Sequence, residues 1–288
     1  MKNHYTLLNQ SKNKKIPFSI EIQEHHSDID THTHDCVELV VILSGRAEHS
    51  IDDETYELTA GDVFVVSKNS EHGYKSVSKI KYANIMFDYQ NLTENLSELM
   101  LIPGFQTLFV LEPKFRKEHK FESKLQLDSV SLGFVKELLN ILLKEYVENN
   151  RGQEFAISTY FLTLITYLSR QFDSNQNTAS SKLYRLSNAI LYLQSNFLEP
   201  IHIDDVAAIS YLSTRQFARV FKKSFEMSPK EYLIKLRLDY ACRLMEQSHK
   251  TISEVALESG FSDISFFSRI FKSKIGVSPK IYRKSRII

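Results

Sequence analysis

Cysteine and long apolar runs are both scarce in this chain of 288 residues. Cys36 and Cys242 are too few and too far apart for a disulfide framework or a cysteine-based zinc site, which fits a reducing compartment. The longest apolar stretch, 161–168, is eight residues long and contains two threonines, whereas a membrane-spanning helix needs about 18 apolar residues. The amino terminus is basic but has no apolar segment typical of a secretion signal. We therefore expect a cytoplasmic protein without membrane spans.

The composition is that of a folded protein, with 42% apolar and 25% charged residues, which excludes disordered and collagen-like chains. The length favours two domains. The net charge of +1 hides an uneven distribution, because residues 181–288 carry 18 basic and 10 acidic side chains, a net of +8, while residues 1–180 carry 18 and 25, a net of −7. A basic carboxy-terminal third is typical of a nucleic-acid-binding module. A polar segment rich in Asn and Ser lies between, so we expect domains at 1–170 and 184–288 joined by a linker at 171–183.

The basic third contains an internal repeat. Thirteen residues recur at an offset of 49 and then 50: Ile203, Val206, Ala207, Ser210, Ser213, Phe217, Arg219, Phe221, Lys222, Ser228, Pro229, Lys230 and Tyr232 are repeated as Ile252, Val255, Ala256, Ser259, Ser262, Phe267, Arg269, Phe271, Lys272, Ser278, Pro279, Lys280 and Tyr282. Each copy has the apolar spacing of two short helices, with caps expected at Thr251 and at Ser262 or Asp263 in the second copy. This predicts two helix-turn-helix units.

A helix predicted over 229–247, about 28 Å long, would hold the two units about one DNA turn apart. A preceding helix with Leu186, Ile190, Leu193 and Phe197 on one face completes seven helices. The polar faces of the second helices carry side chains suited to bases and phosphates: Arg215, Gln216, Arg219 and Lys222, and Ser265, Ser268, Arg269 and Lys272. A protein-binding helical domain is the alternative, but it does not explain why Arg and Lys recur on the outward face of both copies.

Residues 184–286 resemble the DNA-binding domain of the AraC/XylS family of bacterial transcription regulators, most specifically in GFSDISFFSRIFKSKIGVSPKIYRK from Gly260 to Lys284. Tyr211 and Glu226 replace glycines frequent in that family, which affects turn geometry. The resemblance implies base contacts at Arg215, Ala218 and Arg219 in the first unit and at Asp263, Ile264, Ser265, Ser268 and Arg269 in the second. With the neighbouring Thr214, Gln216, Lys222 and Lys272, these form the predicted DNA-binding set.

Residues 18–87 alternate in polarity over short segments, which predicts strands of five to eight residues in an antiparallel sandwich or small barrel. The predicted strands are FSIEIQEH, ELVVILSG, AEHSIDDETYEL, DVFVV and KYANIMF, with turns at Ser44-Gly45, Asp52-Asp53 and Ala60-Gly61-Asp62. The fold class is therefore α+β multidomain, with an amino-terminal barrel and an all-α carboxy-terminal domain.

His32 and His34 share one face of a strand and are followed by Glu38 and later by His72. Three histidines and a glutamate are plausible ligands for a divalent metal. They resemble the two motifs of the cupin fold, although His26, Ser67 and Asn69 depart from the usual residues. Three interpretations stay open: a metal site, a metal-free effector site in which the imidazoles bind a polar ligand, and a merely structural cluster. A metal-dependent cupin enzyme of sugar metabolism that also binds DNA is the alternative function.

Two helices are predicted after the barrel, over 130–149 and 155–170. Their apolar residues follow coiled-coil spacing: Leu132, Val135, Leu139, Leu142 and Tyr146 in the first, and Ile157, Phe161, Leu164 and Leu168 in the second. Both helices could pack on the barrel. The family resemblance instead implies that one of them binds a partner, so that the protein is a homodimer.

Three stretches, HTHDCVELVVILSG, GDVFVVSKNSEHGY and IPGF, also resemble regulators of bacterial L-rhamnose catabolism. The resemblance implies a monosaccharide effector such as L-rhamnose, bound by His32, His34, Glu38, His72 and Tyr74, which offer donors and acceptors. It further implies activation through RNA polymerase, no enzymatic activity and no required cofactor. Effector binding would shift an equilibrium between two arrangements of the domains. A constitutive DNA-binding protein whose barrel only dimerises is a third possibility.

Overall fold

The computed structural model describes residues 3–11, 17–51, 54–88, 96–119, 124–148, 150–174 and 182–286. The chain forms two compact units, residues 1–187 and 188–288. We call them the amino-terminal and carboxy-terminal units. The segment expected as a linker, 171–183, begins as a continuation of helix α6 (Gln153–Ser174), and residues 175–181 lie outside the described residues. The division between the units falls within helix α8 (Lys182–Asn196).

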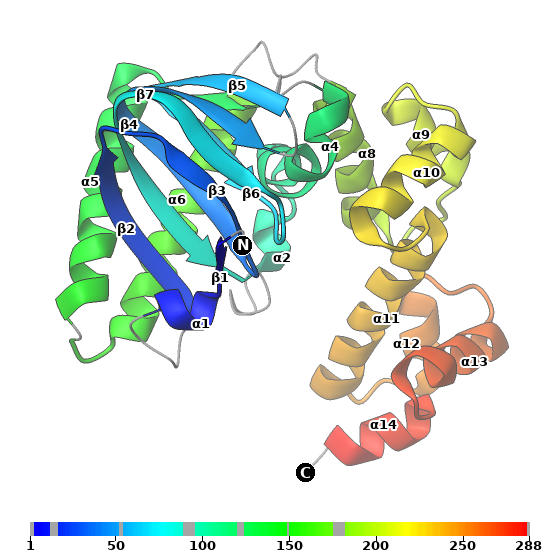
Figure 1. The fold of residues 1–288 in the computed structure, drawn as a ribbon. Helices are drawn as coiled ribbons and strands as arrows, with labels where there is room; N and C mark the ends of the chain where they lie inside the picture. The colour runs from blue at the N-terminus through cyan, green and yellow to red at the C-terminus, as the bar shows by residue number, and fades with distance from the viewer. Residues whose placement is uncertain are drawn as a thin grey trace. The chain divides into compact units, whose positions relative to one another are not determined.

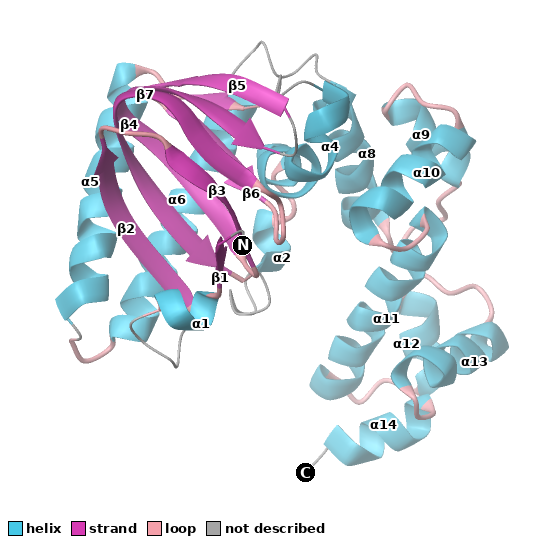
Figure 2. Ribbon diagram, in the orientation of Figure 1, coloured by secondary structure: helices cyan, strands magenta, loops and turns pink. Residues whose placement is uncertain are grey.

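The amino-terminal unit is built on one eight-stranded sheet, coloured magenta in Figure 2. Its strands are β1 (Asn3–Tyr5), β2 (Phe18–His25), β3 (Ile29–His34), β4 (Val37–Ile51), β5 (Glu54–Thr59), β6 (Asp62–Val66), β7 (His72–Phe87) and β8 (Leu125–Gln126). The order is β1-β3-β7-β4-β6-β8, with β2 also paired to β7 and β5 to β4. The pairs are antiparallel except β1 with β3. The predicted strands at 18–25 and 62–66 have the observed bounds.

Two strands are far longer than predicted, since β4 has 15 residues and β7 has 16. The turn expected at Ser44-Gly45 is wrong, because β4 continues through it with register shifts against β7. Gly45 has a φ of 88°, and a Cβ there would lie 1.8 Å from the carbonyl oxygen of Lys79. Only glycine allows this close approach, so Gly45 marks a β-bulge within one strand. The turn expected at Asp52-Asp53 lies outside the described residues.

Alternation along the strands divides the side chains between two faces. On β4, Leu39 and Val41 face one apolar core, whereas Val40 and Ile42 face another. Helices α5 (Ser129–Glu148) and α6 cover the first face (Figure 2). The other helices before α8 among the described residues of this unit are α1 (Leu7–Gln10), α2 (Leu96–Leu99), α3 (Pro103–Phe105), the π-helix η2 (Gln106–Leu111) and α4 (Glu112–His119).

The apolar stripes of α5 and α6 are both buried in the first core: Leu132, Val135, Leu139, Leu142 and Tyr146, and Ile157, Phe161, Leu164 and Leu168. The apolar stripes are therefore explained by packing within this unit, and the prediction that one of the two helices binds a partner must rest on their other faces. The sheet offers a broad apolar face, and two helices are needed to cover it. Coiled-coil spacing and packing on a sheet produce similar patterns, so the sequence alone could not separate them.

The carboxy-terminal unit and the start of α8 contain seven helices among the described residues, as predicted (Figure 1). After α8 these are α9 (Ile203–Ile209), α10 (Thr214–Phe225), α11 (Pro229–Gln247), α12 (Ile252–Glu258), α13 (Ile264–Ile275) and α14 (Pro279–Arg286). Helix α11 has the predicted bounds. Hydrogen-bonding side chains cap the second helix of each copy, Ser213 before α10 and Asp263 before α13.

Two residues of the first copy adopt the left-handed backbone that glycine adopts in the second. Tyr211 and Glu226 have φ values of 55° and 60°, and their counterparts Gly260 and Gly276 have values of 81° and 90°. Both copies therefore keep a left-handed residue at these turns, and the substitutions place strain in the first copy. No helix in the described part of the chain has the length and apolar character to cross a membrane.

Candidate functional site: a polar cavity and two basic helices

The inner face of the sheet encloses a cavity of about 410 Å³, within the range of small-molecule sites. Its lining comes mainly from β2, β3 and β7: on β2 and β7, the cross-strand pairs Glu21 with Asn84 and Gln23 with Tyr82 both face it. Glu38 from β4 closes one side. With Tyr5 from β1 and Gln10 from α1, the cavity is walled by side chains from five strands and one helix, which fixes their relative positions.

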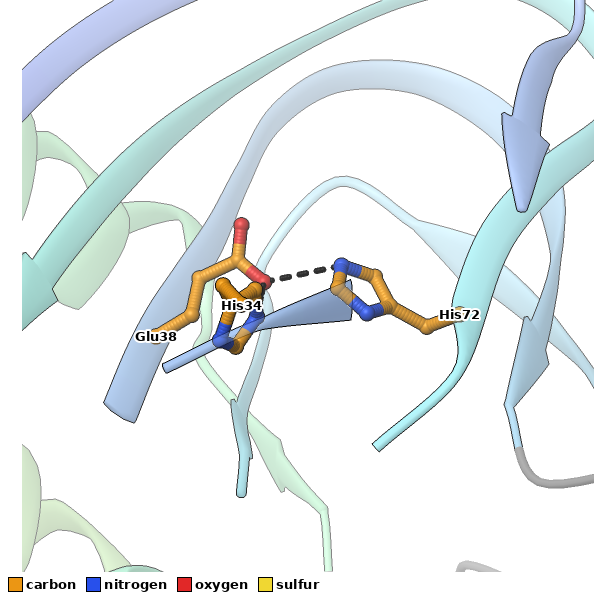
Figure 3. Close-up of side chains that lie close together, drawn as sticks. All are labelled: His34, Glu38 and His72. Carbon is orange, nitrogen blue, oxygen red and sulfur yellow. Dashed lines mark hydrogen bonds and ion pairs between the residues drawn. The ribbon is translucent and has the colours of Figure 1, made fainter. Parts of the chain in front are cut away.

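Three of the predicted residues meet at one point, shown in Figure 3. The Oε2 atom of Glu38 lies 3.0 Å from the Nε2 atoms of both His34 and His72. Each of the three side chains is almost fully buried. The other ring nitrogen of His34, Nδ1, lies 2.8 Å from the carbonyl oxygen of Cys36, a contact that holds the orientation of the ring.

Interactions within this cluster shift the pKa values of His34 and Glu38. Burial acts to lower the pKa of His34, but its interactions with the Cys36 side chain and with Glu38 raise it to about 10. Burial acts to raise the pKa of Glu38, and the nearby His72 and His34 instead hold it well below its usual value. An ionised Glu38 beside a protonated His34 therefore forms a buried ion pair.

His32 and Tyr74 lie beside this cluster rather than in it. His32 Nδ1 lies 2.9 Å from the carbonyl oxygen of Asp30, and its ring centroid is 4.2 Å from that of His72. Burial and His72 lower the pKa of His32, which favours the neutral ring. Tyr74 is buried, and its hydroxyl has no hydrogen-bond partner among the described residues. Both residues line the cavity.

The cluster has a donor set suited to a divalent metal. One ligand atom from each of His34, Glu38 and His72 lies within 4.8 Å of the others. Two imidazoles and a carboxylate are a known metal-binding combination, and a carbonyl bonded to the outer nitrogen of a ligand is typical of such sites. His32 is not part of this group. The residues therefore fit a metal with three protein ligands rather than the expected four.

Several cavity residues were not predicted from the sequence, chiefly Ser19, Glu21, Gln23, Tyr82 and Asn84. The signal was present in the alternation of β2, where polar side chains at 19, 21, 23 and 25 share one face. A polar face on a strand normally faces solvent, so the pattern alone did not indicate a cavity. The Oδ1 atom of Asn84, like the Tyr74 hydroxyl, has no hydrogen-bond partner in the described residues.

The predicted DNA-binding residues lie on α10 and α13 and at their first turns. Arg215, Arg219 and Lys222 on α10 are exposed, as are Arg269 and Lys272 on α13. Arg219 and Arg269 form no ion pair with any described residue. Ile264 and Ser265 are also exposed, whereas Ala218 and Ser268 are half-buried. Each helix thus presents free cationic side chains to solvent beside its buried phenylalanines.

Three residues of the predicted set have structural contacts of their own. Gln216 completes the capping box of α10, with its Oε1 atom accepting from the Ser213 backbone at 3.1 Å. Thr214 donates to Asp204. Asp263 caps α13 and accepts from the backbone of Ser265 at 2.7 Å. Gln216 and Asp263 therefore have capping roles in the free protein, and Thr214 has a partner in Asp204.

Two family models match the chain. A model of an AraC-like ligand binding domain matches residues 18–165, and a model of a helix-turn-helix domain matches residues 206–285. The HTH-type transcriptional activator RhaR of Mannheimia succiniciproducens is 24% identical over 96% of this chain and 94% of its own length. RhaR of Escherichia coli O139:H28 is 27% identical, over 88% of this chain and 86% of its own. Among solved structures, a transcriptional regulator of Chromobacterium violaceum with an AraC-type DNA-binding domain is similar to this chain. The match covers 36% of this chain, with 32% identity and a TM-score of 0.34.

Proposed function

Because the chain belongs to the AraC family of transcription regulators, we propose that a small sugar, bound in the cavity of the amino-terminal unit, controls its activation of transcription. The observation that carries the proposal is the cavity itself. It has the volume of a small-molecule site, and two polar atoms in its wall, the Tyr74 hydroxyl and Asn84 Oδ1, lack partners among the described residues. Buried polar groups without partners are costly, and a bound polar ligand would satisfy them.

The chemistry of the wall suits a polyol. Gln23, Asn84 and Tyr74 offer both donors and acceptors for hydroxyl groups. The rings of Tyr74 and Tyr82 stack with centroids 5.3 Å apart, which holds both side chains in place in the cavity wall. The relatives named RhaR, together with the resemblance to regulators of L-rhamnose catabolism, make L-rhamnose the first sugar to test.

In this proposal α10 and α13 are the recognition helices. Arg215, Arg219 and Arg269 would read base edges in successive major grooves, and Lys222 and Lys272 would contact phosphates. The segment 171–183 joins a ligand-binding domain, 1–170, to a DNA-binding domain, 184–288. The sugar would favour one of two arrangements of these domains, which requires that it bind that arrangement more tightly.

Dimerisation and RNA polymerase contact complete the proposal. Since the coiled-coil stripes are buried, a second copy would pack on the outer faces of α5 and α6. Apolar side chains are exposed there: Val130, Phe134, Ile141, Val147 and Phe155. Exposed apolar side chains gathered on one or two helices are typical of a protein interface. Contact with RNA polymerase is expected of an activator, and no residue of this chain is assigned to it.

A metal in the cavity is the second candidate, favoured by the convergence of His34, Glu38 and His72. These three residues would hold a divalent ion, which would supply a Lewis-acidic anchor for a sugar hydroxyl. The family membership favours a regulator over a metal-dependent enzyme in either case, so a metal would serve binding rather than turnover.

A thermal-shift screen of the whole protein against monosaccharides, with and without a chelator, tests the proposal. We expect one sugar to raise the melting temperature equally in both conditions. The same sugar should change the affinity for operator DNA measured by fluorescence anisotropy. A shift that the chelator abolishes would favour the metal site. Absence of a shift with every sugar would contradict sugar control and favour a constitutive DNA-binding protein.

A further inference from the structure

Among the described Asp, Glu, Lys and Arg side chains, only acidic ones line the cavity. Four carboxylates line it, Glu21, Asp28, Asp30 and Glu38, and none of its lining residues is a lysine or an arginine. A site that binds a phosphate or carboxylate group normally presents arginine, lysine or a row of backbone N–H groups. This cavity presents the opposite charge.

The carboxylates divide into one inner and three outer groups. Glu38 is buried and already paired with His34 and His72. Glu21, Asp28 and Asp30 are exposed and form no ion pair with a described residue. The Glu21 carboxylate accepts from Gln23 Nε2 at 2.7 Å, and Asp28 accepts from the Val77 backbone at 3.2 Å. No cation among the described residues therefore neutralises these three outer carboxylates, which lie on the solvent-exposed side of the cavity.

The inner wall supplies an independent sign of a ligand. Tyr74 is 2% exposed, lines the cavity, and has a hydroxyl without a partner among the described residues. Asn84, also in the wall, has an unpartnered Oδ1 atom. A hydroxyl and an amide are suited to neutral hydroxyl groups of a ligand, and neither compensates a negative charge.

We propose that the cavity binds its sugar without negative charge and rejects the phosphate ester and the sugar acid of the same sugar. This inference rests on the proposed sugar control and adds the charge class of the effector. Repulsion between an anionic ligand and these three carboxylates weakens binding. The regulator then reports the free sugar.

Isothermal titration of the whole protein with matched ligands tests this inference. The ligands are L-rhamnose, L-rhamnonate and L-rhamnose 1-phosphate, with D-glucose, D-gluconate and D-glucose 6-phosphate as a second set. In the set whose neutral member binds, we expect each anion to bind at least about tenfold more weakly. Raising the salt concentration should narrow this difference, because screening weakens exposed charges.

Two variants identify the cause of the discrimination. Glu21→Gln combined with Asp30→Asn should reduce the ratio of neutral-sugar affinity to phosphate-ester affinity several-fold, whatever the double variant does to the neutral sugar alone. Glu24→Gln is the matched control, since Glu24 lies on the same strand but not in the cavity wall, and it should change neither. The inference is overturned if an anion binds as tightly as its neutral sugar, or if the double variant leaves the discrimination unchanged. Failure of every neutral and anionic sugar to bind would instead overturn the proposed sugar control, and the inference with it.

Discussion

Arg269 lies over the ring of Phe266, with 5.7 Å between the guanidinium carbon and the ring centroid. Phe266 is half-buried and packs on Phe261, so the ring is held by the core of the second helix-turn-helix unit. The first copy has no such support, because the offset of 50 places Gln216 at the position of Phe266, and Gln216 belongs to a capping box. Arg269 is therefore restrained before DNA binds, whereas Arg219 is not.

This restraint predicts that Phe266→Leu weakens specific DNA binding without removing any DNA-contacting group. An exposed cation–π contact contributes about 0.5–1 kcal/mol, so we expect a loss of about twofold to fivefold in operator affinity. A double-mutant cycle with Arg269→Ala measures the coupling. Once Arg269 is absent, Phe266→Leu should have no further effect. Equal losses with and without Arg269 would show that the ring acts only through the fold.

The arginines and the lysines of α10 and α13 should contribute differently to DNA binding, the arginines to sequence specificity and the lysines to affinity for any DNA. Arg219→Ala and Arg269→Ala should each cost about 1–3 kcal/mol on the operator and relax specificity at one position. Lys222→Ala should weaken all DNA sequences alike and reduce the salt dependence. Anisotropy titrations with operator and random DNA at several salt concentrations separate the two effects. Equal losses on both DNAs for the arginine variants would contradict base reading.

The left-handed residues of the two copies predict opposite stability changes. Glu226→Gly should stabilise the protein by about 0.5–1 kcal/mol, because glycine adopts a φ of 60° without strain. Gly276→Ala should destabilise it by about 1 kcal/mol through the backbone alone, since no atom lies within 4 Å of the added Cβ. Urea denaturation of the two variants checks this pair. Destabilisation by Glu226→Gly would mean that its side chain outweighs the strain.

Local patterns predicted much of the carboxy-terminal unit. The bounds of α11 follow from Pro229 at its start and a regular apolar spacing, and the repeat fixed the positions of both units. Such helices are determined by neighbours three and four residues apart, which the sequence displays directly. Even the two missing glycines were recognisable as turn positions.

The cavity was harder to predict because distant residues build it. Glu21 and Asn84 become neighbours only through the pairing of β2 with β7. The long β4 was divided at Gly45, since a glycine within a strand has the same signal as a turn. The cluster of His34, Glu38 and His72 was found, but the position of His32 outside it depends on the bond of its ring to the Asp30 carbonyl. The cavity wall, the length of β4 and the position of His32 all depend on tertiary packing. Packing of this kind cannot be read from a single sequence.

The buried pair of His34 and Glu38 predicts a stability that falls at alkaline pH. The pKa of His34 is about 10, above the 6.5 of an unfolded chain, so its contribution is complete below about pH 6.5 and is lost as the pH rises toward 10. Glu38 has a lowered pKa, and its contribution is lost only in acid, below about pH 4.5. Urea midpoints measured in a chelator from pH 6 to 10 should therefore decrease. His34→Gln should flatten this decrease, and His26→Gln, an exposed control, should not. A midpoint that stays constant for the native chain would contradict the ion pair.

Tyr74 and Tyr82 predict opposite responses to loss of a hydroxyl, although their rings stack on each other. The Tyr74 hydroxyl has no hydrogen-bond partner in the described residues, whereas the Tyr82 hydroxyl donates to Gln23 Oε1 at 2.8 Å. Tyr74→Phe should therefore leave the stability of the free protein unchanged or slightly higher, and weaken sugar binding by about twofold to tenfold.

Tyr82→Phe is the matched control, because it removes a hydroxyl that the free protein already uses. It should lower the free energy of unfolding by about 1 kcal/mol, since Gln23 Oε1 loses its shorter hydrogen bond and keeps only the 3.3 Å contact with His25 Nε2. Thermal melts of the free proteins and calorimetric titrations with the sugar measure both quantities. If Tyr74→Phe destabilises the free protein as much as Tyr82→Phe does and leaves sugar affinity unchanged, the Tyr74 hydroxyl has an internal partner and the ligand does not contact it.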